Sequence, residues 1–441
     1  MKRLSLAIAL LGSFSIANAQ TEESFLSKLQ PEIQYTRPGD KTGLNQFETT
    51  KDETVPYEGL KVKFGAGFSQ QFQSLKHSNS GAVPLYPRLA PGFGIAQANL
   101  NIDVQLYDGI KLNLTTYLAA RHHNEAWVKG GYIQFDKLPF KGEGWDKLMQ
   151  YATIKMGHME INYGDQHFRR SDGGNTIHNP FIENYIMDAF ATEIGGEVYL
   201  QNDGVMGMIG ISNGLINGTH QQPIFAAGTD TTQYKRNPSV YLKGAVDKNL
   251  GEVRVRGAAS LYYNNSSGRS TLYAGDRTGS NYFFVMEGVS ATSKDNFTSG
   301  RYSPNLTNQI LAIQLNGFVK AKGFEFFGTY ENAKGRSINE KVANFDKRNV
   351  NQFAADALYR IGEKEKVYIG ARYNTVRGQL VTSNKDKQSI DRVAVGGGWF
   401  VTNNILLKGE YVNQKYNDFP ATNILSKGEF KGVVMQAVVG F

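Results

Sequence analysis

Residues 99–118 alternate in polarity with a period of two, and this rhythm strongly constrains what the chain can form. Residues 99–106 read NLNIDVQL, and after the turn signal Asp108-Gly109 residues 110–114 continue as IKLNL. Successive side chains of a β-strand point to opposite faces, so the pattern predicts a hairpin with one apolar and one polar face. The apolar face can pack on a second sheet of a water-soluble sandwich or contact lipid; it carries Leu100, Ile102, Val104 and Leu106.

The same alternation recurs along most of the chain and predicts sixteen strands. They lie at residues 61–74, 93–107, 110–121, 126–136, 151–160, 189–201, 205–212, 239–247, 253–263, 309–320, 324–332, 350–361, 367–376, 390–402, 405–413 and 431–441. Tight links such as Asn403-Asn404 alternate with long polar connections such as 264–308. An even strand number with short turns at one end and long loops at the other is typical of bacterial outer-membrane barrels. The fold of a soluble sandwich does not require short connections at one end and long connections at the other.

The composition narrows the alternatives further. The chain has no cysteine, which excludes disulfides and thiolate metal sites. After the first twenty residues no apolar run approaches the roughly 18 residues of a transmembrane helix. Strands that span a membrane must close into a barrel, because unpaired backbone groups are costly in hydrocarbon. We therefore predict an all-β fold, a transmembrane antiparallel β-barrel of about sixteen strands over residues 61–441, with short periplasmic turns and long extracellular loops.

The two ends of the chain carry features of an exported protein. The start, MKRLSLAIALLGSFSIANAQ, has a basic beginning, a short apolar segment and a small-residue cleavage site, which predicts a signal peptide at residues 1–19. Residues 20–60 fit no strand pattern and are expected to form a periplasmic N-terminal extension. The last strand, FKGVVMQAVVGF, ends on Phe441 and resembles the C-terminal signal read by the outer-membrane barrel assembly machinery. The predicted location is the outer membrane of a Gram-negative bacterium, in contact with membrane lipid and lipopolysaccharide.

The strand face opposite the lipid would line the lumen, and it carries charges of both signs. The basic candidates are Lys111, Arg121, Lys155, Lys243, Arg254, Arg256, Lys320, Arg360, Arg372, Arg392 and Lys408. The acidic candidates are Asp103, Asp136, Glu193, Glu197, Asp247, Glu325, Glu331, Asp356 and Glu410. Rings of one sign give strong ionic selectivity, so this mixture predicts a water-filled pore with at most a weak anion preference. The alternative is that the charges pair with one another and only solvate the wall.

Other functional classes are not indicated. Removal of Lys2 and Arg3 with the signal peptide leaves 46 of the 48 basic residues against 40 acidic ones, a net charge of +6 in place of +8. The excess is spread along the chain, so no nucleic-acid partner is expected. Asp165, His167 and Ser171 lie in one segment, but no nucleophile elbow or zinc motif accompanies them. We expect no enzymatic activity, no cofactor and no metal site.

Six stretches of the chain follow the pattern of one family of outer-membrane proteins. They are TRPGDKTGLNQFETTKDE, LKVKFGAGFSQQFQSLKH, IKMGHMEINYGD, YIGARYN, VAVGGGWFVTNNILLKGEYV and the terminal FKGVVMQAVVGF. On these residues the chain resembles the phosphate-selective porin O and P type, as found in Bacteroidetes-like bacteria. The resemblance implies a sixteen-stranded porin, often a homotrimer, that passes small hydrophilic or anionic solutes.

The resemblance also implies roles for particular residues. In sixteen-stranded porins the third loop folds inward, which would bring residues 161–188 to a constriction, with His167, Arg169, Arg170 and Asp172 facing the wall charges. The alternative for this segment is an exposed loop tip. Phosphate selectivity in that family rests on ladders of Arg and Lys. Part of such a ladder would be Arg254, Arg256, Arg360, Arg372 and Arg392, although interspersed Asp and Glu residues depart from an all-basic track.

The predicted function is a porin for passive diffusion of small hydrophilic solutes, with a mild phosphate-like anion preference. The alternative is an outer-membrane barrel scaffold whose extracellular loops, notably residues 264–308, bind a protein or glycan partner. The polarity of the lumen distinguishes the two, because a scaffold can fill its interior with apolar side chains.

Overall fold

The structure, a computed structural model, describes residues 30–118, 126–140, 142–171, 174–216, 218–221, 235–274, 281–382 and 385–441. The strands are β1 (Lys61–Ser78), β2 (Gly92–Phe93), β3 (Gln97–Tyr107), β4 (Ile110–Leu118), β5 (Ala126–Phe135), β6 (Ala152–Glu160), β7 (Thr192–Asn202), β8 (Val205–Ser212), β9 (Ser239–Leu250), β10 (Val253–Asn264), β11 (Gln309–Ala321), β12 (Phe324–Arg336), β13 (Arg348–Ile361), β14 (Val367–Gly378), β15 (Gln388–Phe400), β16 (Ile405–Asn417) and β17 (Glu429–Gly440).

The helices are short. The α-helices are α3 (Glu143–Met149) and α4 (Ile338–Val342), and the 3₁₀ turns are η1 (Lys41–Gly43), η2 (Gln166–Arg169) and η3 (Asn175–His178). Among the described residues, no helix combines the length and the apolar character needed to cross a membrane.

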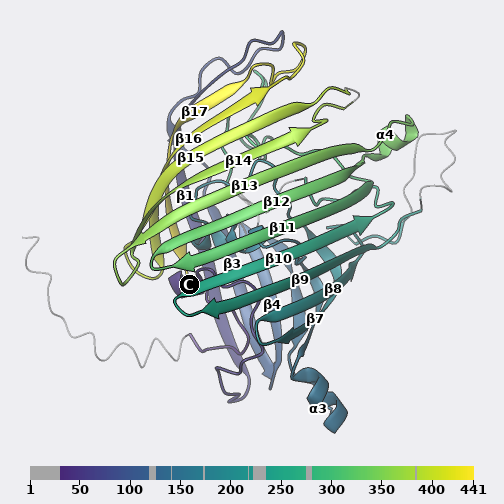
Figure 1. The fold of residues 1–441 in the computed structure, drawn as a ribbon, viewed down its shortest axis with the longest axis vertical. Coiled ribbons are helices and arrows are strands. Elements are labelled where there is room, and N and C mark those ends of the chain that lie inside the picture. Colours follow the sequence, from purple (N-terminus) through teal and green to yellow (C-terminus); the bar gives the residue numbers. More distant parts are fainter. Residues whose placement is uncertain are drawn as a thin grey trace, which may run out of the picture.

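All strands belong to one sheet that closes on itself (Figure 1). The first half of β1 pairs antiparallel with β3, and its second half pairs antiparallel with the C-terminal strand β17. The two-residue β2 adds only a short pairing at Phe72 of β1, so sixteen long strands form the barrel. Closure removes every sheet edge that would expose unpaired backbone groups. The predicted antiparallel sixteen-stranded barrel is confirmed.

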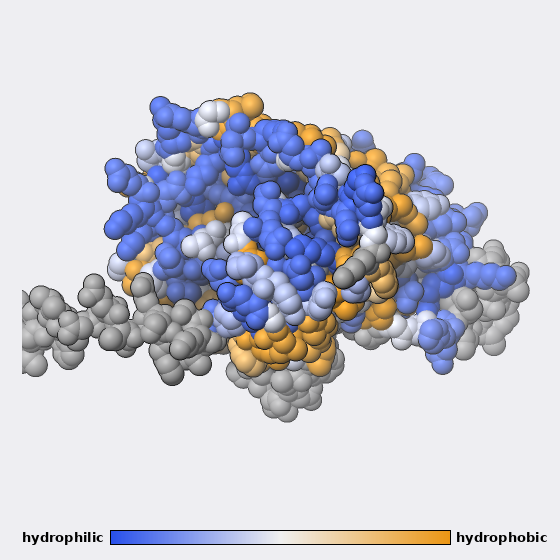
Figure 2. All heavy atoms as spheres, turned by 90° about the horizontal axis from the view of Figure 1, so that it is seen from below, coloured by the Kyte–Doolittle hydropathy of each residue, from blue (hydrophilic) through white to orange (hydrophobic). Residues whose placement is uncertain are grey.

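The outer surface of the barrel is an apolar band. Along β11 the side chains of Leu311, Ile313 and Leu315 are exposed, and the residues between them are buried. The ten steps from Leu311 to Ala321, at about 3.3 Å each and a tilt of about 40°, span roughly 25 Å across the band, the height expected for the lipid-facing belt. In Figure 2 apolar side chains gather on the flanks of the molecule, and hydrophilic ones cover the end that faces the viewer.

Short and long connections alternate around the barrel, as predicted. One end carries turns such as Asp203-Gly204, whose two residues have φ values of 43° and 70°, as a type I′ hairpin turn requires. The other end carries long connections, among them residues 265–308. The exception is the link between β5 and β6, which contains α3 and protrudes from the short-turn end (Figure 1).

The buried core of this protein lies inside the barrel. Ile186 and Phe283 come from two long connections, and they are fully buried together with the wall residue Tyr262. Since the outer surface is apolar and exposed, these connections must provide the apolar groups that pack against the inner wall. The interior is therefore occupied over much of its circumference, in contrast to the open water-filled lumen that the sequence suggests.

Candidate functional site in the barrel lumen

Residues 161–191, called the inner loop below, connect β6 to β7 and run along the inner wall of the barrel. Apart from Phe168, Gly174 and Asn175, the described residues of the inner loop are buried. Backbone N–H groups of the loop donate to wall side chains of five strands: Gly164 to Ser260 (3.0 Å), Asp165 to Asn316 (2.8 Å), Met187 to Gln352 (2.9 Å), Ile186 to Asn374 (2.6 Å) and Ile182 to Glu410 (2.8 Å). Polar wall residues thus satisfy the backbone of a buried, irregular segment.

The two adjacent arginines of the inner loop have different partners. Arg169 donates to Glu325 of β12 at 2.8 Å, and Arg360 of β13 donates to the second oxygen of the same carboxylate at 2.9 Å. Arg170 instead pairs with Asp188 within the loop, at 2.5 Å. His167 contacts Glu160 at 2.7 Å. Asp172, the fourth residue predicted at the constriction, lies outside the described residues.

A second buried cluster joins the inner loop to β9 and β10. Lys243 lies 2.8 Å from both Asp165 and Glu48, and Arg256 lies 2.8 Å and 2.7 Å from the same two carboxylates. Burial alone would raise the pKa of Asp165, but Lys243 and Arg256 outweigh this effect and lower that pKa below its ordinary value. The cluster is therefore charged and internally neutralised.

The other predicted lumen residues from β9 to β17 also have partners inside the barrel. The ion pairs are Arg254 with Asp247 (2.7 Å), Lys320 with Glu365 (2.7 Å), Arg372 with Asp356 (2.7 Å) and Arg392 with Glu183 (2.8 Å). Lys408 donates to backbone carbonyls of the inner loop, at Thr176, Asn179 and Phe181. Tyrosine hydroxyls donate to three further carboxylates, Glu193 and Glu197 of β7 and Glu331 of β12. The ion-paired charges neutralise each other and produce little net field.

The segment of residues 30–60 contributes contacts that the sequence did not indicate. Asn45 donates to Glu325 at 2.7 Å, and Phe47 packs against Phe318 and Phe327 of the wall. Glu48 is the shared partner of the cluster on β9 and β10. No strand periodicity marks these residues. One feature of the sequence could have pointed to them. The wall has more basic than acidic candidates, so some of its basic side chains need carboxylate partners from other parts of the chain.

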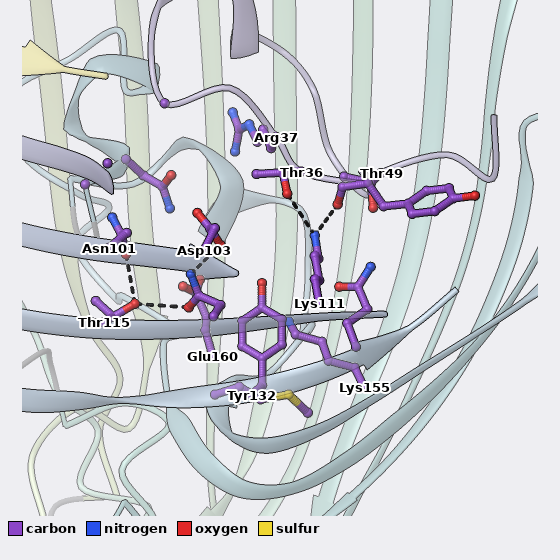
Figure 3. A pocket seen from close by; sticks show the side chains of 18 of the residues that line it. Thr36, Arg37, Thr49, Asn101, Asp103, Lys111, Thr115, Tyr132, Lys155 and Glu160 are labelled. Carbon is purple, nitrogen blue, oxygen red and sulfur yellow. Dashed lines mark hydrogen bonds between the residues drawn. The ribbon is translucent and has the colours of Figure 1, made fainter. Parts of the chain in front are cut away.

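A cavity of about 330 Å³ remains on the other side of the lumen (Figure 3). It lies between residues 35–49, the inner loop and the inner faces of β1 and β3 to β7. The polar face of the hairpin formed by β3 and β4 lines it: Asn101 and Asn113 accept hydrogen bonds from Thr115, and Asn113 donates to Asp103. Arg121, a predicted lining residue of the neighbouring region, lies outside the described residues.

The cavity is richer in unpaired cations than the rest of the lumen. Its walls include Arg37, Lys63, Lys111 and Lys155, and none of these four forms an ion pair with a described carboxylate. Lys111 donates to the carbonyl of Tyr35 and to Thr36. Lys155 lies 4.1 Å from the centre of the Tyr132 ring. The lining carboxylates Asp103 and Glu160 are held by neutral or histidine partners, and Glu48 pairs with Lys243 and Arg256. Basic side chains therefore outnumber acidic ones in the wall of the cavity.

Comparison with known proteins supports the fold. No family model and no curated protein matches the chain. Among solved structures, the anion-selective porin from Comamonas acidovorans is 11% identical with a TM-score of 0.52, over 87% of this chain and all of that one. OmpF of Salmonella typhi in complex with daunomycin is 10% identical (TM-score 0.48, 88% and 99% covered), and the outer membrane channel DcaP of Acinetobacter baumannii is 9% identical (TM-score 0.45, 88% and 99% covered).

The likeness to the Comamonas acidovorans porin supports the class of fold. The chain is a closed, sixteen-stranded β-barrel of the kind found in outer-membrane proteins. The similarity to the Comamonas acidovorans protein covers nearly the whole barrel, and at 11% identity it concerns the fold alone.

Proposed function

We propose that this protein is an outer-membrane porin for passive diffusion of small hydrophilic solutes, with a mild preference for anions of the phosphate type. The observation that carries the proposal is the asymmetry of charge pairing in the lumen. From β9 to β17 most wall cations form ion pairs, with Lys408 as an exception, whereas the cavity beside β1 and β3 to β7 has four cations without an ion pair among the described residues. Solutes would pass through the cavity beside β1 and β3 to β7.

The proposal includes the surroundings of the barrel. The apolar outer band fits the lipid and lipopolysaccharide of the outer membrane of a Gram-negative bacterium. Residues 1–19, which lie outside the described residues, would act as the signal peptide for export, and residues 20–60 would enter from the periplasm. We further propose a homotrimer and membership of the phosphate-selective porin O and P type, which the sequence resembles.

The scaffold function is a second candidate, and one observation favours it. The inner loop and the buried parts of residues 30–60 and 281–308 occupy the interior, so the barrel has a packed core like that of a structural protein. In this case the external loops would bind a protein or glycan, and little current would flow through the barrel.

Conductance in planar bilayers tests the two functions. A porin gives steady single-channel steps, and a salt gradient gives a reversal potential on the anion-selective side. Replacing both Lys111 and Lys155 with Gln should shift the reversal potential toward cations, because two unpaired cations leave the cavity. Lys334→Gln, an exposed lysine outside the lumen, is the matched control. Absence of steps from folded protein would exclude the porin and leave the scaffold.

A further inference from the structure

A second cavity, of about 440 Å³, lies at the long-loop end of the barrel. It is enclosed by the inner faces of β1 and β3, the connection between them, and residues 281–293. Four side-chain amides line it, those of Gln71, Gln73, Gln97 and Asn281. The cavity is separate from the charged one described above, with which it shares no lining residue.

Two of these amides have an unused polar atom. Gln71 is 6% exposed and Asn281 is 8% exposed, and neither Gln71 Oε1 nor Asn281 Nδ2 has a hydrogen-bond partner in the described part of the chain. Gln71 is held in its orientation because its Nε2 donates to the carbonyl of Tyr282 at 3.2 Å. Ser69 connects the two residues, since its hydroxyl lies 3.5 Å from Asn281 Oδ1 and it precedes Gln71 on the same face of β1. A buried acceptor and a buried donor thus remain without a partner on residues that line this cavity.

The pairing of a free acceptor with a free donor selects the chemistry of a ligand. A hydroxyl group both donates and accepts, so a polyol satisfies Gln71 Oε1 and Asn281 Nδ2 together. A carboxylate can only accept, and it would leave Gln71 unsatisfied; an ammonium group can only donate. No described Asp, Glu or Lys lines the cavity, and its single charged residue, Arg88, is exposed. The cavity therefore fits an uncharged ligand.

Aromatic side chains complete the site. Tyr86, Tyr282 and Phe284 line the same cavity, and the hydroxyl of Tyr282 donates to the carbonyl of Ser293 at 2.5 Å, which fixes its ring. Aromatic rings offer flat apolar surfaces for the C–H faces of a sugar ring. The volume lies within the range of roughly 300–1,000 Å³ that is usual for small-molecule sites. It is of the order needed for one or two sugar rings.

We propose that this cavity binds a neutral mono- or disaccharide at the mouth of the barrel. The inference rests on the proposed porin function, for which it names a class of solute that is held before passage. Gln71 and Asn281 bind hydroxyl groups, Gln73 and Gln97 shape the polar wall, and Tyr282 packs against a sugar face. The site has one face on strand β1 and the other on residues 281–293.

Titration calorimetry on the purified full-length protein in detergent tests the site. The probes are glucose, galactose, mannose, N-acetylglucosamine and maltose, with inorganic phosphate as the anionic comparison. We expect saturable binding of at least one saccharide, and about tenfold weaker binding in Gln71→Leu and in Asn281→Leu, since each loses a buried hydrogen bond. Gln314→Leu is the matched control, because Gln314 is a buried wall glutamine with both amide atoms unpartnered, away from the cavity.

Several outcomes overturn the proposal. It fails if none of the saccharides binds, if the two variants bind as the wild type does, or if phosphate binds with the same dependence on Gln71. Heat-modifiable electrophoretic mobility shows whether each variant is folded, and Gln71→Asn, which only withdraws the acceptor, replaces a Leu variant that does not fold. Conductance of the same preparation separates the two proposals: steps without saccharide binding contradict only this inference, and binding without steps contradicts the porin.

Discussion

Arg169 of the inner loop donates to Glu325 of β12 at 2.8 Å, and both side chains are almost completely buried. Arg360 holds the other oxygen of the carboxylate, so Glu325 neutralises two guanidinium groups. Glu325→Gln leaves both without a full counter-charge, and we expect a loss of roughly 3–5 kcal/mol in the free energy of unfolding. Urea unfolding in detergent measures this. Glu252→Gln, which breaks the exposed pair with Lys322, should have almost no effect and is the control.

Replacing Glu48 tests how the charges in the lumen set the ion selectivity. It shares Lys243 and Arg256 with Asp165, so Glu48→Gln leaves two cations with one carboxylate inside the lumen. We expect the reversal potential to move toward greater anion preference. Glu58→Gln removes an exposed carboxylate of the same segment and should leave selectivity unchanged. An identical reversal potential in Glu48→Gln and the wild type would mean that this cluster is remote from the solute path.

Acid should loosen the inner loop. Burial alone would raise the pKa values of Glu48, Asp165 and Asp188, but the adjacent Lys and Arg residues lower all three below their ordinary values. Groups with a depressed pKa stabilise the folded state above their unfolded pKa of about 4, and this stabilisation is lost as the pH falls through the folded value. Conductance should therefore change little between pH 7 and about pH 4, and should increase or become noisy only at about pH 2, below the ordinary carboxylate range. Asp188→Asn should weaken the pH dependence, because one of the titrating pairs is absent.

The lipid-facing surface can be tested at Leu315. This exposed residue lies close to the middle of the apolar band of β11. Leu315→Arg would place a charge deep in hydrocarbon, and we expect a loss of roughly 2–4 kcal/mol in the free energy of unfolding from vesicles. Lys334→Arg keeps a charge at an exposed position and should cost little. Equal stability of the two variants would argue against a membrane around this band.

The sequence by itself determined the barrel, because the alternation of polar and apolar residues and the turn residues are local features of the chain. Alternation along a strand assigns each side chain to a face whatever its neighbours are, as for Leu100 and Asp103, and turn residues such as Asp203-Gly204 fix where strands reverse. The ends of the strands depend on contacts with other segments. Residues 189–191, predicted as the start of a strand, belong to the inner loop, where Phe190 donates to the carbonyl of Leu272 in another connection.

Only the tertiary structure decided how the lumen is filled and which charges stay unpaired. Glu48 and Arg256 are 208 positions apart, and Ile182 and Glu410 are 228 positions apart, yet each pair is in direct contact. No periodicity encodes such contacts, because they depend on where two irregular segments cross inside the closed sheet. The sequence by itself placed polar residues on the inner face of β3 and β4. The structure decided that these residues line a cavity, since the inner loop packs against the opposite wall and leaves their side accessible.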